Sequence, residues 1–511
     1  MLCRLHGRHF ATSLSPTSRD PGHKRRREKA CAFSGCVFAN SNAKDDLMVI
    51  GIILSLALLT YIAYRGWSVI LFAPVCALLA ALTAGLPLLP SYTELYMVKA
   101  VTYVKNFFPI FLLGAVFGKV MEESGAARSV AHFIATSLGA RRAIPAIVLA
   151  AAFLTYGGVS LFVVAFAVYP FASALFKEAG LPRRLIPGAI ALGAFCFTMT
   201  ALPGTPQIQN MIPAKYFNTN TFAAPVFGTV GAIIMAVAGL AWLEYRKRKM
   251  LTAGEGYGEP DMRVQTNFDD GVPHLHPALA ALPLITVLAV NFVMTKLISG
   301  WDPTVMQGTS ALPLASKVVP TANWALIIAL IVGILMASAF AFRQFKARRN
   351  FSAALNAGAI GSLLAIMNTA SEVGYGNIVS SLPGFASVRD FLLSIDPGTP
   401  LVSEALVVNV LAGITGSASG GMSIALEAMG SRYLEWATQV GLSPELLHRV
   451  AAMASGGFDT MPHNGAVITL LAITGMTHSK SYPDIGMVSL VIPFLTTMLL
   501  IGVWTMFGFT M

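Results

Sequence analysis

Long apolar runs recur along most of this chain, and they constrain its fold more than any other feature of the sequence. Many of them reach about 20 residues, the length at which an α-helix crosses the hydrocarbon core of a bilayer. Of the 511 residues, 55% are hydrophobic and only 12% are charged, and the mean hydropathy is +0.67. A soluble protein of this size needs more charge to cover its surface. The sequence therefore predicts an all-α polytopic membrane protein.

Basic residues give the chain a formal net charge of +11, but their positions argue against nucleic acid as a partner. Most lysines and arginines fall in short loops between apolar runs, which is the positive-inside pattern of membrane proteins. The sequence contains no Gly-x-x-x-x-Gly-Lys-Ser/Thr motif, so we do not expect ATP-driven transport. Cys31 and Cys36 lack a second pair of metal ligands nearby. We expect a lipid bilayer as surroundings, no metal and no cofactor, and leave a homo-oligomer open.

The composition divides the chain into four parts. Residues 1–46 are polar and basic, and we interpret them as a disordered tail or as translation from a start codon upstream of the natural one. Residues 47–245 form a first transmembrane repeat, residues 246–276 a cytoplasmic linker and residues 277–511 a second transmembrane repeat. The halves share the order of their elements, including Gly180-Leu-Pro182 and Gly441-Leu-Ser-Pro444. The distribution of basic residues then predicts two repeats of inverted topology.

Each repeat contains a predicted re-entrant hairpin, because its two apolar arms are too short to span a bilayer. The arms are Ala143–Thr155 and Ser160–Phe176 in the first repeat, and Leu401–Ile414 and Met422–Met429 in the second. Helix N-termini that follow such tips offer free N–H groups and a positive dipole end to an anion. The alternative is close helix packing through small residues. The tip residues that we take as candidates for substrate binding are Gly157, Gly158, Ser160, Ser417, Ser419 and Gly420.

Each repeat also contains a predicted broken helix, Leu185–Gln209 in the first and Leu446–Ile473 in the second. Proline and glycine break both runs, and freed backbone groups are tolerated at membrane depth only inside protein or beside a cavity. Discontinuous helices in corresponding positions of two halves are typical of binding sites in secondary transporters. The breaks therefore add four candidates for substrate binding, which are Gly204, Thr205, His463 and Asn464.

Asp459 is an acidic residue within an apolar segment, where such residues are costly and usually functional. We predict that it couples a cation to transport, although an N-cap or a solvated cavity wall would also explain it. His463 could bind an anion, relay protons or have a structural role. We expect Glu372 at a helix end near water and no arginine within a span. A carboxylate substrate would then meet backbone N–H groups, hydroxyl groups, asparagine and histidine rather than an arginine clamp.

The motifs Tyr156-Gly-Gly158, Ala201-Leu-Pro-Gly-Thr-Pro206 and the region of Gly420 and Asp459–Asn464 resemble the gluconate permease (GntP) family. The resemblance covers about residues 48–511 and is closest to the D-3-hydroxybutyrate permease branch. It implies the ion-transporter superfamily fold and cation-coupled uptake of hydroxy acids through the bacterial inner membrane. Gluconate-type members carry a Ser-His-Val-Asn-Asp-like run at the second break. Here that run is Thr460-Met-Pro-His-Asn464, which favours a smaller acid.

The sequence as a whole favours a secondary symporter of a small carboxylate such as D-3-hydroxybutyrate or gluconate, coupled to protons or else to sodium. A membrane-embedded enzyme that uses Asp459 and His463 is a second interpretation. The chain has neither a His-Glu-x-x-His nor a Gly-x-Ser-x-Gly motif, and paired hairpins have no explanation in an enzyme. A passive channel is a third interpretation, which dependence on an imposed ion gradient would exclude.

Overall fold

The computed structural model describes residues 48–507 except for 60, 63–64, 66, 160, 259–274, 303–307, 310–311, 314–319, 343–344, 346–350, 388–389, 391–397 and 463. The chain divides into two units, residues 1–47 and residues 48–511, and every described residue belongs to the second. The predictions for residues 1–46, for Ser160 and for His463 therefore concern residues outside the described part of the chain.

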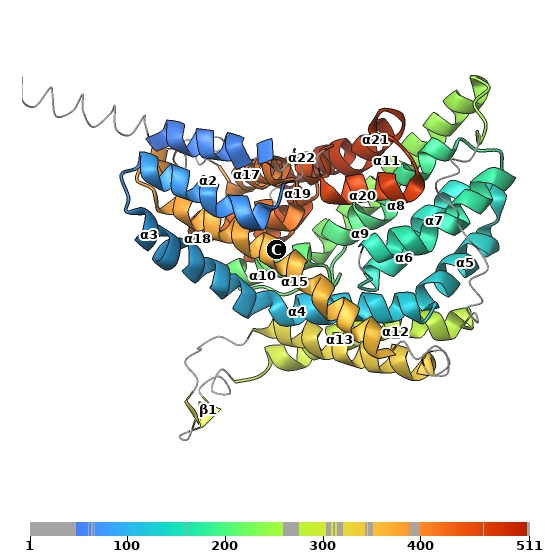
Figure 1. Cartoon of the computed structure of the whole chain (residues 1–511), viewed down its shortest axis with the longest axis horizontal. Coiled ribbons are helices and arrows are strands. Elements are labelled where there is room, and N and C mark those ends of the chain that lie inside the picture. The colour runs from blue at the N-terminus through green and yellow to red at the C-terminus, as the bar shows by residue number, and fades with distance from the viewer. Residues whose placement is uncertain are drawn as a thin grey trace, which may run out of the picture. The chain divides into compact units, whose positions relative to one another are not determined.

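Helices make up nearly all of the regular structure in the described residues (Figure 1). The exception is a short antiparallel pairing of β1 (Gly308–Thr309) with β2 (Leu312–Pro313). Six helical stretches in this part of the chain are long and apolar enough to cross a membrane, and a pair bent by 100°, Ala126–Leu138 with Ala140–Tyr156, would add a seventh. The prediction of a helical, polytopic membrane protein is confirmed at this level.

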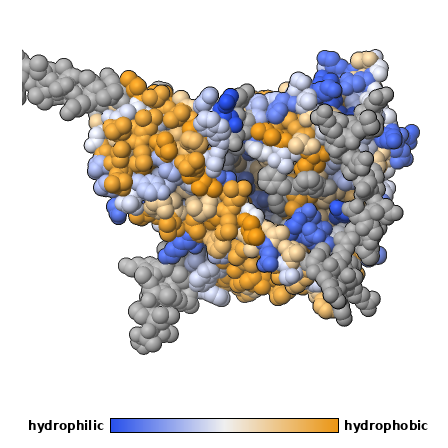
Figure 2. Space-filling view, in the orientation of Figure 1, coloured by the Kyte–Doolittle hydropathy of each residue, from blue (hydrophilic) through white to orange (hydrophobic). Residues whose placement is uncertain are grey.

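Four of the six stretches are single helices: α11 (Pro225–Thr252), α12 (Pro277–Ser299), α13 (Thr321–Phe340) and α15 (Phe351–Ser381). The stretch Leu88–Glu123 consists of α3 (Leu88–Pro90), the π-helix η1 (Ser91–Met97) and α4 (Val98–Glu123). The stretch His478–Phe507 consists of α21 (His478–Gly486), the π-helix η6 (Met487–Val491) and α22 (Ile492–Phe507). Shorter apolar helices at the start are Met48–Leu59 and α2 (Val69–Thr83). Figure 2 shows apolar residues gathered on one face over α2 and α13. Leu71 of α2 and Leu335 of α13 are exposed, as expected of helices that face lipid.

Two helical hairpins have their tips where the sequence predicts them, but the last arm, predicted as Met422–Met429, extends over the 22 residues Ala418–Gln439. The first consists of α6 (Ala143–Tyr156) and α7 (Leu161–Glu178), and the second of α17 (Pro400–Thr415) and α18 (Ala418–Gln439). The 14 residues of α6 rise about 21 Å, less than the roughly 30 Å of a hydrocarbon core. The arms of the second hairpin meet closely, because a Cβ atom on Gly421 would lie 2.1 Å from the backbone nitrogen of Ala412.

Both predicted broken helices are broken. The first comprises η3 (Arg183–Leu185), α8 (Ile186–Ala194), the single turn α9 (Phe197–Thr200) and α10 (Ile208–Phe217), and the second comprises α19 (Pro444–Ser455), the 3₁₀ turn η5 (Phe458–Thr460) and α20 (Gly465–Thr474). Gly204 in the first break has a φ of +78°, a conformation that side chains other than glycine rarely adopt. The two breaks meet, because the Cα of Gly456 packs against the side chain of Thr200.

The same turn follows each hairpin. Gly180 after α7 has a φ of +64° and Gly441 after α18 a φ of +70°. The next N–H group donates back to the helix in both cases, from Leu181 to Phe176 at 2.8 Å and from Leu442 to Ala437 at 2.8 Å. This is the left-handed glycine cap that ends many helices. A hairpin, this cap and a broken helix therefore follow one another in both halves.

Two expectations about the helices are wrong. A helix that the sequence did not predict, α5 (Ala126–Leu138), lies between α4 and the first hairpin. Helix α15 continues to Ser381, so Glu372 is buried within it at 3% exposure rather than at a helix end near water.

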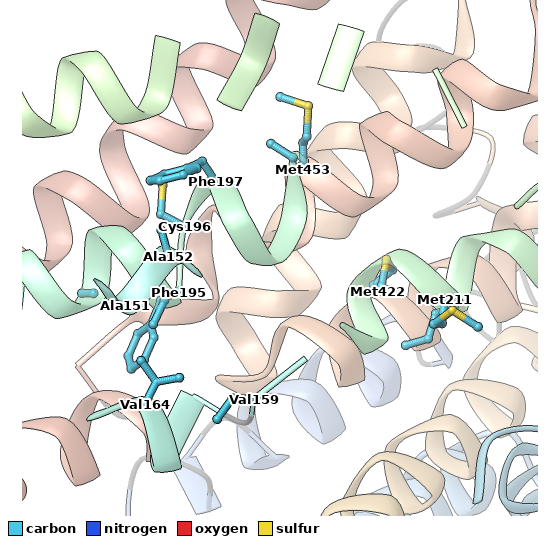
Figure 3. Close-up of a cluster of buried hydrophobic side chains, with 14 of the residues drawn as sticks. Ala151, Ala152, Val159, Val164, Phe195, Cys196, Phe197, Met211, Met422 and Met453 are labelled. Atoms are coloured by element: carbon cyan, nitrogen blue, oxygen red, sulfur yellow. The ribbon is translucent and has the colours of Figure 1, made fainter. Parts of the chain in front are cut away.

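A cluster of buried apolar side chains joins the hairpins to the broken helices (Figure 3). It includes Ala152 of α6, Phe195 of the first break, Met211 of α10, Met422 of α18 and Met453 of α19. All five side chains are almost fully buried. The hairpins and the breaks therefore share one core, which fixes where their polar ends meet.

Candidate functional site: a cavity between two hairpins and two helix breaks

A cavity of about 600 Å³ lies where the hairpin tips and the helix breaks come together. The first half contributes Gly158 from its hairpin tip and Gln207 from its break, and the second half contributes Ser417 and Asp459 from the corresponding places. Helices α4 and α15, which pack along one another, supply further walls. A volume of this size suits a small ligand.

The structure brings five of the predicted site residues to this cavity, which are Gly158, Ser417, Ser419, Asp459 and Asn464. Four others lie behind its wall among the described residues. Gly157 packs against Leu284 of α12, Gly204 against the ring of Phe222 and Gly420 against the carboxyl group of Glu372, while the side chain of Thr205 is fully buried. The remaining two, Ser160 and His463, lie outside the described residues.

Asn464 ties the second break to the second hairpin. Its Nδ2 donates to the carbonyl oxygen of Gly416 at the hairpin tip at 2.8 Å and to that of Asp459 at 2.9 Å. Its Oδ1 accepts from the backbone N–H groups of Ala466 and Val467 and so caps α20. One side chain thereby satisfies four backbone groups that a broken helix and a hairpin tip leave free.

Two side chains tie the first break to the first hairpin. Nε2 of Gln207, the residue before α10, donates to the carbonyl oxygen of Thr155 at 2.8 Å. The hydroxyl group of Tyr156 donates to the carbonyl oxygen of Pro203 at 2.8 Å. The hairpin tip and the break therefore hold one another through backbone carbonyl groups in this half as well.

A buried arginine, which the sequence analysis missed, holds the first break from the second half. Arg449 is 0% exposed and lies in α19, the first segment of the second broken helix. Its Nη1 donates to Oδ1 of Asn210 at 2.9 Å, and its Nη2 donates to the carbonyl oxygens of Ala223 at 2.8 Å and Thr221 at 3.2 Å. The guanidinium group is used for these contacts and does not line the cavity.

His448, beside Arg449, was also missed. It is 0% exposed, and its ring nitrogens lie 2.6 Å from Oγ1 of Thr219 and 3.1 Å from Oδ1 of Asn210. A Leu-Leu-His-Arg run within the predicted second broken helix was the available signal, because charged side chains inside a span are rarely without a role.

The acidic groups of the cavity are Asp459 and Glu372. Asp459 is 4% exposed, and its Oδ1 has no hydrogen-bond partner among the described residues. The turn that carries it is fixed by the next residue, because Oγ1 of Thr460 donates to the carbonyl oxygen of Ser489 at 3.1 Å. The carboxyl group of Asp459 is therefore held at the cavity wall, with one buried oxygen atom that has no hydrogen-bond partner among the described residues.

Positive potential at the cavity comes from backbone dipoles. No lysine or arginine is among the described residues that line it. Helix α18 begins after Ser417 and α20 begins after Asn464, and both N-terminal turns line the cavity. Helix N-termini carry partial positive charge. Asn464 already accepts from the N–H groups of Ala466 and Val467, and Ser417 accepts from that of Gly420, so it is the positive dipole ends of the two helices that suit this end of the cavity to a small anion. Among the described residues, no group of three or more His, Cys, Asp or Glu could hold a metal ion.

Three comparisons place this chain among known proteins. The family model described as GntP family permease matches residues 46–371. An uncharacterised transporter of Bacillus subtilis (strain 168), YxjC, is 49% identical over 455 residues, which cover 86% of this chain and 95% of that protein. The crystal structure of the Alcanivorax borkumensis YdaH transporter matches with a TM-score of 0.51 at 16% identity, covering 81% of this chain and 89% of that one. At that identity the last match concerns the fold alone.

Proposed function

The chain belongs to the GntP permease family, and we propose that it is a secondary active transporter that takes up a small hydroxycarboxylate together with a cation. The family and the transporter-named relative favour transport over a membrane-embedded enzyme. The proposed location is the bacterial inner membrane. The long apolar helices would cross it, and the hairpins and broken helices would enter it.

The observation that carries the proposal is the single cavity at which both hairpin tips and both breaks converge. Irregular backbone at membrane depth is tolerated only in protein or beside a cavity, and midplane sites of this kind are where secondary transporters bind substrates. We propose that the two halves are inverted repeats and that the cavity lies on the axis that relates them. The repeated order of hairpin, glycine cap and broken helix supports this.

The proposed substrate is a small monocarboxylate that carries a hydroxyl group, such as D-3-hydroxybutyrate, with gluconate as the larger alternative. The N-terminal turns of α18 and α20 would attract its carboxylate group. Ser417 and Ser419 offer hydroxyl groups for its hydroxyl group. We assign substrate contacts to these two residues and to Gly158. Asn464 would shape the cavity wall through its bonds to the backbone, and Gly157, Gly204, Thr205 and Gly420 would have supporting roles behind the wall.

The proposed coupling residue is Asp459, and the proposed cation is a proton. Asp459 lines the cavity that would receive the anion, and its buried Oδ1 has no hydrogen-bond partner among the described residues. A charged Asp459 would repel a carboxylate substrate, so protonation of Asp459 should favour loading. Sodium is the rival cation, because a carboxylate group and nearby backbone carbonyl groups can ligate it as well.

Uptake by proteoliposomes tests the proposal. Labelled D-3-hydroxybutyrate and labelled gluconate are offered separately under an inward proton gradient, an inward sodium gradient and no gradient. We expect accumulation of at least one acid above the outside concentration, only with an imposed gradient and faster with protons. Equilibration of the acid at a rate independent of both gradients would indicate a channel. Uptake that depends on sodium at fixed pH would mean that the coupled cation is sodium and not a proton.

A further inference from the structure

Glu372 is the second carboxyl group at the cavity, and nothing so far gives it a role. It lies in α15, is 3% exposed, and lines the cavity beside the second hairpin tip. Its Oε2 has no hydrogen-bond partner among the described residues. A buried polar atom without a partner destabilises a fold unless a ligand satisfies it.

The start of α18 leaves space for the carboxyl group of Glu372. A Cβ atom on Gly420 would lie 1.6 Å from Oε2 of Glu372, so only glycine at this position leaves the space that the carboxyl group occupies. Oγ of Ser419 lies 3.4 Å from Oγ1 of Thr369, one helical turn before Glu372. The carboxyl group therefore sits against the N-terminal turn of α18, where an anionic substrate would also bind.

The surroundings of Glu372 favour its neutral form. Tyr96 of η1 and Tyr103 of α4 are the titratable groups close to it, and Asp459 lines the same cavity from η5. No lysine or arginine among the described lining residues is available to pair with it. Burial of an ionised carboxylate without a partner is far more costly than burial of the neutral acid.

We infer that Glu372 is a substrate-binding residue which acts as a neutral carboxyl group and donates its proton in a hydrogen bond to an oxygen atom of the bound anion. A protonated carboxyl group in an apolar site can serve as such a donor. It would replace the arginine that the cavity lacks. When ionised, it would instead repel the substrate from the N-terminus of α18. The inference rests on the proposed function, since it requires an anionic substrate.

Equilibrium binding of labelled D-3-hydroxybutyrate to the purified full chain in detergent tests this role between pH 6 and pH 9. The variants are Glu372→Gln, which keeps an N–H donor and cannot ionise, and Glu372→Leu, which removes the donor. Glu404→Gln is the matched control, because Glu404 is a buried carboxyl group of α17 that does not line the cavity. Asp459 is unchanged in wild type and in all three variants, so its ionisation does not contribute to the differences between them.

We expect Glu372→Leu to bind about tenfold more weakly than wild type at pH 6, the loss of one hydrogen bond to a charged group. Wild type should weaken more steeply towards pH 9 than Glu372→Gln does, and Glu404→Gln should follow wild type. Unchanged binding by Glu372→Leu, or the same alkaline loss in Glu372→Gln as in wild type, would overturn the inference.

A second readout does not need the substrate. Dicyclohexylcarbodiimide reacts with protonated carboxyl groups in apolar surroundings, and mass spectrometry locates the modified residue. We expect labelling of Glu372 at pH 7 in the unliganded protein. An unlabelled Glu372 overturns the inference whatever the substrate proves to be. Labelling of Glu372 in a protein that binds neither D-3-hydroxybutyrate nor gluconate supports the neutral carboxyl group and contradicts the proposed substrates instead.

Discussion

Asn464 donates a hydrogen bond from Nδ2 to the carbonyl oxygen of Gly416 at 2.8 Å, and this contact joins the second helix break to the second hairpin tip. Gln207 makes the equivalent contact in the first half, with the carbonyl oxygen of Thr155 at 2.8 Å. Both amide side chains stand directly before a helix, α20 or α10, and both acceptors lie at the end of the first hairpin arm. In each half, an amide side chain therefore holds the helix break to the hairpin tip by a hydrogen bond.

Replacement of Asn464 should release the second helix break from the second hairpin tip. Asn464→Ala removes the cap of α20, worth about 1 kcal/mol, and leaves two carbonyl groups without their donor, at about 1–3 kcal/mol more. We expect a lower unfolding midpoint and at least a tenfold loss of uptake. Asn464→Ser, which can still cap the helix but cannot bridge to Gly416, should recover part of the stability and little of the uptake.

The control for this series is Asn323→Ala. Asn323 of α13 also donates from Nδ2 to a backbone carbonyl, that of Asn106 at 2.9 Å, but it does not line the cavity. It should lose some stability and keep its uptake. Equal uptake by Asn464→Ala and Asn323→Ala at equal abundance would show that transport does not need the hydrogen bond from Asn464 to Gly416.

Arg449 should prove structural rather than substrate-binding. Lysine keeps the charge but cannot present the planar fork that bonds Asn210, Thr221 and Ala223 at once. We expect Arg449→Lys to lose about 2 kcal/mol or more of stability, measured by thermal unfolding in detergent. Arg432→Lys, on an exposed part of α18, should stay within about 0.5 kcal/mol. An unchanged midpoint for Arg449→Lys together with a raised KM would instead mean direct contact with the substrate.

The close approach of the second hairpin arms gives a packing test. Gly421→Ala places a methyl group where the backbone of Ala412 lies, and such overpacking costs about 1–3 kcal/mol. Gly502→Ala in α22 meets no atom within 4 Å and should be neutral or stabilising by about 0.5–1 kcal/mol. Thermal unfolding midpoints should fall for the first variant only. A stable, active Gly421→Ala would mean that the arms separate freely.

The hairpins and the breaks could be predicted from the sequence because their signals are local. Proline and glycine interrupt apolar runs at Pro203 and Pro462, and short apolar arms flank the glycine-rich tips. Local chemistry also placed Asp459 and Asn464 among the candidates, and the structure brings both to the cavity. Helix α5 was missed because Arg128, Ser129 and His132 interrupt its apolar pattern, so it does not resemble a span.

Arg449 and Glu372 could not be placed from the sequence, for a physical reason. Each is charged in water and lies near the end of an apolar run, so the expected position was a helix end. Arg449 is buried because carbonyl groups from a loop more than 200 residues away accept its hydrogen bonds. Glu372 is buried because Gly420 of another helix leaves room for it. Neither partner is visible in the local pattern.

Substrate should protect both halves of the cavity at once. We propose Ile208→Cys and Ser419→Cys, one from each half, in a background without native cysteines. Both positions line the cavity and are partly exposed. Labelled D-3-hydroxybutyrate or gluconate should slow their reaction with a polar thiol reagent several-fold. Thr252→Cys, at the exposed end of α11, should react equally with and without substrate. Protection of only one cavity position would contradict a shared site.

Accumulation by Asp459→Asn tests the central claim, cation-coupled uptake through this cavity, most directly. Asparagine mimics the neutral carboxyl group and cannot release a proton. We expect Asp459→Asn proteoliposomes to exchange labelled for unlabelled substrate at a rate within about tenfold of wild type, and to show no accumulation under an inward proton gradient. Wild-type proteoliposomes should accumulate the same acid. Accumulation by Asp459→Asn to the wild-type level would contradict the assignment of coupling to this residue.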